Sequence, residues 1–173
     1  MEIKTTARAT SRHAIHGGHQ SEPTPVSDDD AGEARLLFVS IGLCQADLEA
    51  PAFSIPSLVE SILKRLKAAG ASSLVEMFLT RVSVYGAESG VGYEHAKMVN
   101  EAPFTTTYSV TFVRGYDMTD PAVQVLRRDD LIIHQHVDAQ SVNFRVELPS
   151  TMSLDNPIVG ARRVVGAILS LNN

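Results

Sequence analysis

The chain has 173 residues, which fits one domain of ordinary size plus a tail, and it carries a formal net charge of −5. A negative chain does not bind nucleic acid through a broad basic face, and the single cysteine, Cys44, excludes an intramolecular disulfide and favours a reducing compartment. No apolar run approaches the ~20 residues that span a bilayer, so we expect no membrane partner.

Residues 1–33 are predicted to be a flexible N-terminal arm, followed by a β-rich shell domain over residues 34–173. Ser, Thr, Gly, Pro and His dominate the arm, so few apolar groups are available to offset the entropy of ordering it. Because histidine gains charge as the pH falls through ~6.5, we expect weak, pH-dependent binding to RNA. The candidate RNA-contact residues are Arg8, Arg12, His13, His16 and His19.

The shell domain is predicted to begin with a strand, a helix and a second strand. LLFVSIGL, at residues 36–43, has the apolar density of a buried strand. A helix near residues 57–69 follows, because Ser57 and Glu60 fit a capping box and Gly70 is well placed to end the helix. LVEMFLTRVSVYG, at residues 74–86, is interpreted as a strand.

A series of short strands is predicted between residues 104 and 149. Its members are FTTTYSVTFVR, AVQVL, DLIIHQHV and SVNFRVEL, at residues 104–114, 122–126, 130–137 and 141–148. Residues 157–171 fit either a helix or a strand, and this choice stays open. The expected fold class is mainly β: an antiparallel, jelly-roll-like sandwich with one short helix and a flexible arm.

His134, His136 and Asp138 are the sharpest local pattern, because on a strand they would share one face at spacings of about 6–7 Å. Metallo-β-lactamase-type hydrolases carry a further histidine where this chain has Ala139, and cupins need a later histidine that this chain lacks. We therefore expect two ordinary strand histidines, no metal and no cofactor. No Gly-x-Ser-x-Gly elbow is present, and we expect no enzymatic activity.

The order of these segments resembles the coat (capsid) proteins of small icosahedral positive-strand RNA viruses of plants, and among them those of tymoviruses. The likeness covers roughly residues 35–172 and is carried by LLFVSIGL, the helix after it, LVEMFLTRVSVYG, PFTTTYSVTFV, DMTDPAVQVLRRDD and VNFRVELPSTMSLDNP. An arm that is not strongly basic is also similar to the tymovirus case. The pattern departs from a jelly roll after Pro149, where one element remains in place of two. The coat of RNA phages, with a sheet, a C-terminal helix and intimate dimers, resembles the helical interpretation of residues 157–171.

The resemblance implies a structural coat protein that self-assembles into a shell around RNA, located in the virion and the host cytoplasm. Its partners would be copies of itself and RNA. Two alternatives are a non-catalytic β-rich interaction module of a larger complex and a metal-dependent enzyme that uses His134 and His136.

Overall fold

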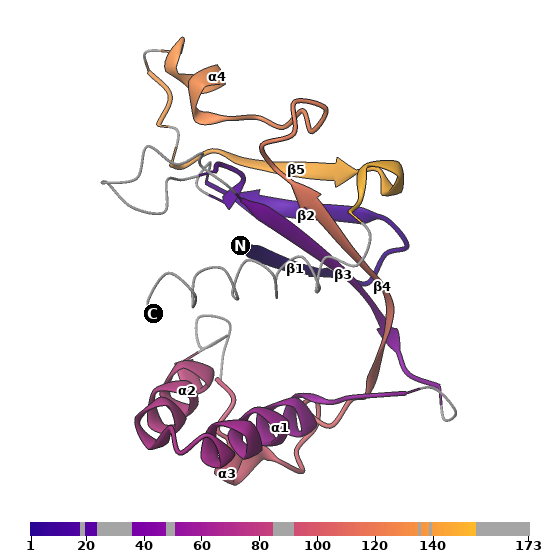
Figure 1. Ribbon diagram of the computed structural model, residues 1–173, viewed down its shortest axis with the longest axis vertical. Helices are drawn as coiled ribbons and strands as arrows, with labels where there is room; N and C mark the ends of the chain where they lie inside the picture. Colours follow the sequence, from indigo (N-terminus) through magenta and orange to yellow (C-terminus); the bar gives the residue numbers. More distant parts are fainter. Residues whose placement is uncertain are drawn as a thin grey trace. The chain divides into compact units, whose positions relative to one another are not determined.

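The computed structural model describes residues 1–17, 20–23, 36–47, 51–84, 92–134, 136–138 and 140–154. The chain forms two compact units (Figure 1). Unit 1 comprises Met1–Leu43 and Val110–Asn173, and unit 2 comprises Cys44–Ser109.

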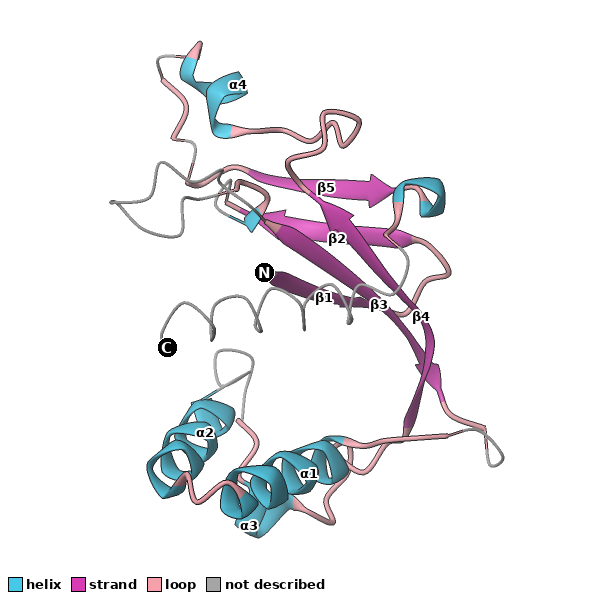
Figure 2. Cartoon of the chain, in the orientation of Figure 1, coloured by secondary structure: helices cyan, strands magenta, loops and turns pink. Residues whose placement is uncertain are grey.

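Unit 1 contains two small sheets (Figure 2). Strands β1 (Glu2–Thr6), β3 (Leu37–Gln45) and β4 (Tyr108–Asp117) form a mixed sheet in the order β1-β3-β4, with β1 parallel to β3. Strands β2 (Ser11–His16) and β5 (Asn143–Leu148) form an antiparallel pair. The short helix α4 (Arg128–Ile132) precedes β5, and the 3-10 turn η3 (Ser150–Met152) follows it.

The core of unit 1 lies between these two sheets. Its buried residues come from β2, β3, β4 and β5 and from the segment that follows β4, and they are Ile15, Phe38, Tyr116, Met118, Val123, Val146 and Leu148. Burying a large apolar side chain contributes about 1.5–3 kcal/mol, so this cluster is the main stabilising feature of the unit.

The described part of unit 2 contains the helices α1 (Ile55–Ala68), α2 (Ser72–Val84) and α3 (His95–Met98). Ser54 caps α1, because its hydroxyl accepts a hydrogen bond from the Ser57 amide while the Ser57 hydroxyl accepts one from the Ser54 amide. Gly70 turns the chain between α1 and α2 with a φ of 67°, a conformation that glycine adopts without strain. The core of this unit is smaller and contains Val59, Leu63 and Tyr93.

The jelly-roll prediction is wrong. The described residues form a mixed α/β fold with two helices of at least seven residues, a mixed three-stranded sheet and a two-stranded antiparallel sheet. The segment at residues 74–86 was expected to be a strand, but its apolar residues recur at helical spacing. Val75, Phe78, Leu79 and Val82 lie on one side of α2 and pack against the core of unit 2.

The prediction of a flexible arm is wrong for its first half, because β1 and β2 both lie within residues 1–17. The composition of β2 is polar, yet Ser11, His13 and Ile15 are buried while the residues between them are exposed. The polar composition gave a wrong prediction because buried polar groups are stable when each has a hydrogen-bond partner. Residues 24–33 of the arm lie outside the described residues.

Of the remaining predicted elements, some are confirmed and others are wrong. The strands at residues 36–43 and 141–148 are confirmed as β3 and β5, the strand at 104–114 overlaps β4, and the helix near 57–69 is confirmed as α1. AVQVL forms no strand, and DLIIHQHV contains α4 instead of a strand. Residues 157–171 lie outside the described residues.

Candidate functional site

Strand β2 separates the candidate RNA-contact residues onto two faces. Arg12 and His16 are exposed, whereas His13 points into the core and is 4% exposed. Arg8 is exposed in the connection between β1 and β2, and His19 lies outside the described residues. The structure therefore keeps Arg8, Arg12 and His16 available to a partner and removes His13 from that group.

His13 belongs to a buried polar cluster between the two sheets. Its Nε2 lies 2.7 Å from Ser40 Oγ, and its ring meets the Phe38 ring edge-on at a centroid distance of 5.5 Å. Nearby, the Tyr116 hydroxyl donates to Ser11 Oγ at 2.7 Å. Burial lowers the pKa of His13 below its usual value, and the positive charge of Lys4 lowers it further. His13 is therefore held neutral and cannot supply charge to RNA.

The His13–Ser40 pair has the spacing of a base and a nucleophile. Ser40 has no exposed surface, however, so a substrate carbonyl cannot reach its hydroxyl in this fold. We assign the pair a structural role, in which each group satisfies the other in the core. Sequence reasoning missed this pair because its residues are 27 positions apart and belong to different sheets.

The outer face of the β2–β5 sheet is polar. Its cross-strand pairs are Arg12 with Glu147, Ala14 with Arg145, and His16 with Asn143. His16 Nδ1 lies 3.0 Å from Asn143 Oδ1, and Arg12 faces an acid in the neighbouring strand. This β2–β5 outer face thus combines two arginines, one histidine and one glutamate, which is a small basic excess.

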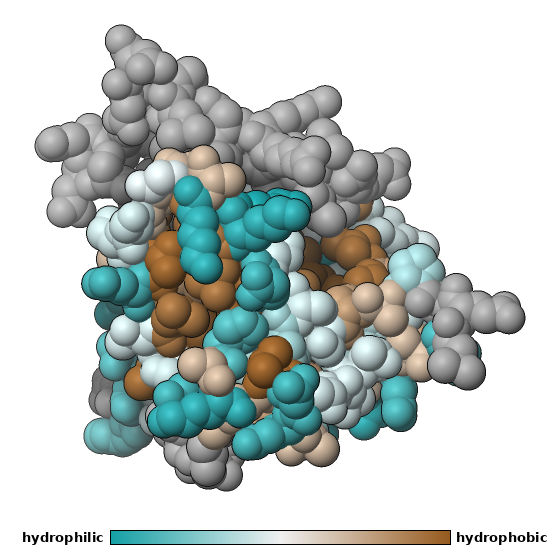
Figure 3. Space-filling model, turned by 90° about the horizontal axis from the view of Figure 1, so that it is seen from below, coloured by the Kyte–Doolittle hydropathy of each residue, from teal (hydrophilic) through white to brown (hydrophobic). Residues whose placement is uncertain are grey.

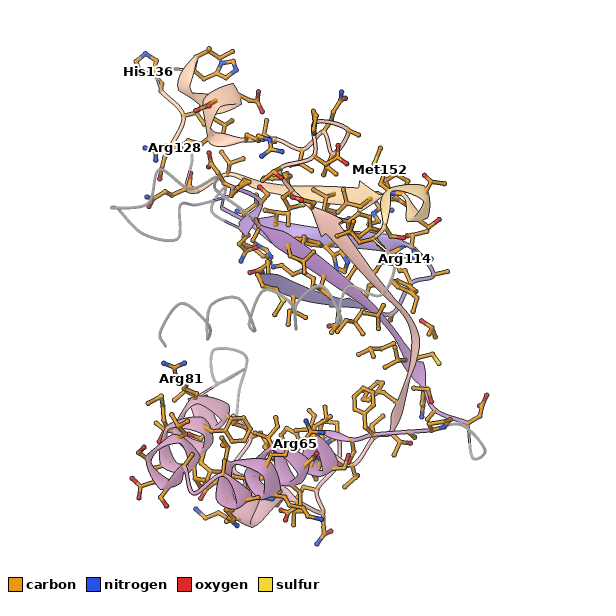
Figure 4. All side chains as sticks on the ribbon, in the orientation of Figure 1. Arg65, Arg81, Arg114, Arg128, His136 and Met152 are labelled. Atoms are coloured by element: carbon orange, nitrogen blue, oxygen red, sulfur yellow. The ribbon has the colours of Figure 1, made fainter. Side chains whose placement is uncertain are left out.

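Arg114 is a further cationic side chain of unit 1 (Figure 4). Its guanidinium stacks 4.0 Å from the centroid of the Phe112 ring and lies 3.4 Å from Ser11 Oγ. Within the described residues no carboxylate pairs with it. The stacking fixes the side chain beside the buried polar cluster.

The histidines of the metal hypothesis do not lie on a strand. His134 follows the end of α4 and His136 is exposed in the turn beyond it (Figure 4), so the alternation that would align them with Asp138 is missing. Across the part of the chain that the structure describes, no group of three or more His, Cys, Asp or Glu residues could hold a metal ion.

Unit 2 contains a hydrogen-bonded chain of three titratable side chains. The Tyr93 hydroxyl lies 2.7 Å from His95 Nδ1, and His95 Nε2 lies 3.2 Å from Glu60 Oε2. Burial raises the pKa of Tyr93. The chain ties the segment before α3 to α1, and since the phenol is buried we assign it a structural role.

Both long helices of unit 2 expose large apolar side chains. We call this set the helical apolar surface, and its exposed fractions are 41% for Ile55, 45% for Leu58, 39% for Ile62, 46% for Leu74, 47% for Met77 and 63% for Val84. On each helix three of these residues recur at spacings of three, four or seven, so they form a stripe on one side. Figure 3 shows apolar surface set among hydrophilic side chains on the face that it presents.

Comparisons with protein-family models, with curated proteins and with solved structures found no match to this chain. Among the described residues, no helix is long and apolar enough to cross a membrane.

Proposed function

We propose that this protein is a structural protein whose copies associate, as subunits of a coat or shell that encloses RNA. The observation that supports this proposal is the exposure of apolar side chains on helix α2. Seven of its 13 residues are apolar, yet none of its residues is buried. A helix that is apolar on more than one side is stable in water when a second surface covers it.

The helical apolar surface provides part of the energy that association needs. Covering six half-exposed side chains contributes on the order of 6 kcal/mol, at roughly 1 kcal/mol each. Association costs about 4–15 kcal/mol in lost translational and rotational freedom. The two amounts are of the same order, so surface beyond these two helices would strengthen the contacts between copies.

The likeness to tymovirus coats does not contribute to this proposal, because it depended on a jelly-roll order of strands. The RNA part of the proposal depends on the β2–β5 outer face and on Arg8, which together expose cations in a chain of net charge −5. Binding to phosphates through so few cations is weak and is reduced by salt. His13 does not contribute to any pH dependence of this binding, because its ring is buried. The proposed location is the virion.

The test is Met77→Asp, which places a carboxylate in the middle of the exposed stripe on α2. We expect association at least about tenfold weaker, because burying an unpaired charge costs more than 1.4 kcal/mol. Light scattering would show the shift from large particles toward the 18.7 kDa monomer, and negative-stain microscopy would show the loss of shells.

Ser72→Asp is the matched control, because Ser72 is an exposed polar position on the same helix and lies at none of the three-, four- or seven-residue spacings from the stripe. Equal association of the two variants would contradict a role for the helical apolar surface. A wild-type chain that remains monomeric at high concentration would contradict the proposed function itself.

A further inference from the structure

One edge of strand β5 has no partner strand among the described segments. The strand pairs with β2 along one side, and within the described residues no backbone hydrogen bond joins its other side to another segment. The segment at residues 119–127 contributes Val123 and Val125 to the core cluster of unit 1 but forms no backbone hydrogen bond with β5. An unpaired row of amide and carbonyl groups is a template for a further strand.

The hydrogen-bond pattern of the β2–β5 pair shows which groups occupy that edge. The Gly17 amide donates to the Val142 carbonyl at 3.0 Å, one step beyond the end of the paired strands. Hydrogen-bonded and non-hydrogen-bonded pairs alternate along an antiparallel ladder. The Val146 backbone therefore bonds toward β2, and the amides and carbonyls of Arg145 and Glu147 point away from it.

The sequence of β5 complements itself when a second copy runs in the opposite direction. With Val146 opposite Val146 of the second copy, Arg145 lies opposite Glu147 of that copy, and Glu147 lies opposite its Arg145. This register also matches the outward-pointing amides and carbonyls, because the Arg145–Glu147 pair becomes a hydrogen-bonded pair. Shifting the centre to residue 145 or 147 would place like charges opposite each other.

The two faces of β5 favour the same arrangement. Val146 and Leu148 are buried and Phe144 packs against the core, so the inner face would continue from one copy to the next as apolar surface. On the outer face, each Glu147 would lie between Arg12 of its own chain and Arg145 of the second copy. The register centred on Val146 therefore brings apolar side chains together on the inner face and opposite charges together on the outer face.

We infer that two copies of this chain pair through this edge of β5, antiparallel and centred on Val146, so that their β2–β5 sheets form one continuous sheet across a twofold axis. This inference rests on the proposed self-association and specifies one interface within it. It adds backbone hydrogen bonds and core contacts to the helical apolar surface.

The test is disulfide formation between two single-cysteine variants, Arg145→Cys and Glu147→Cys, both made in a Cys44→Ser chain because Cys44 is exposed. In the inferred register these positions face each other at a Cα distance of about 5.5 Å, within the range of about 4.4–6.8 Å that disulfides span. Mild oxidation of an equal mixture should convert up to about half of the chains into covalent dimers, because half of randomly formed pairs join unlike chains.

Either variant alone should form far less covalent dimer, because two copies of the same position lie more than about 7 Å apart in this register. A mixture of Arg12→Cys with Arg145→Cys is the matched control, since Arg12 lies on the same face but on β2. Light scattering of the unmodified chain is measured first. If the chain associates but the mixture gives no more dimer than the single variants, the β5 pairing is wrong while the proposed function stands. If the chain is monomeric, both are wrong.

Discussion

His13 shows how one buried ring makes the stability of this protein depend on pH. Its imidazole bonds to Ser40, lies against Phe38 and has a lowered pKa because of burial and the nearby Lys4. In the unfolded chain the same ring takes up a proton below pH ~6.5. The unfolded state therefore binds more protons than the folded state in that range, and stability falls as the pH drops.

We predict that the urea midpoint of the wild-type protein decreases between pH 7 and pH 5, and that His13→Gln reduces this dependence. The substitution should also cost about 1–3 kcal/mol at pH 8, because a glutamine side chain cannot reproduce the buried ring contact with Phe38. His16→Gln is the control on the exposed face of the same strand. If His13→Gln and the wild type lose stability equally on acidification, the buried ring is not the cause.

At the scale of elements, the chain that returns from α2 passes very close to that helix. A Cβ atom at Gly92 would overlap the carbonyl of Ser83, a backbone group near the end of α2 that cannot rotate away. Gly70 differs, since a Cβ there would meet no atom within 4 Å and the cost arises only from its φ of 67°. Gly92 is therefore required for steric reasons, whereas Gly70 is required for its backbone conformation.

Gly92→Ala is predicted to lower the free energy of unfolding by about 2–3 kcal/mol, because the backbone of one segment must shift. Gly70→Ala should cost about 1–2 kcal/mol, the strain of a left-handed conformation. Thermal unfolding of both variants by circular dichroism measures the difference. A Gly92→Ala protein as stable as the wild type would show that the segment is not held against α2.

For the molecule as a whole, the proposed contact with RNA must act through a few local cations against a net charge of −5. Arg8 and Arg12 are exposed in unit 1, and Lys64 and Lys67 are exposed in unit 2. Two double variants, Arg8→Gln/Arg12→Gln and Lys64→Gln/Lys67→Gln, therefore remove the same charge from different places.

We predict that only the arginine variant weakens retention of single-stranded RNA in filter binding. The slope of log affinity against log salt should become less steep by about 1.4, at about 0.7 for each lost phosphate contact. An equal effect of both double variants would indicate attraction to charge in general, and no effect of either would exclude this surface as the RNA contact.

The sequence alone determined the elements whose signal is local. An apolar run such as residues 37–43, the alternation in residues 143–148 and a helix near residues 57–69 depend on near neighbours, and the structure contains all three, although Ser54 caps the helix and not the predicted Ser57. Only the tertiary structure decided the rest. It placed Val75, Phe78 and Val82 of α2 against the core of unit 2, and it buried His13 because Ser40, distant in the sequence, completes its hydrogen bond. A local pattern does not show which distant residues an element will contact, and the composition of a polar segment does not show which of its groups will find hydrogen-bond partners.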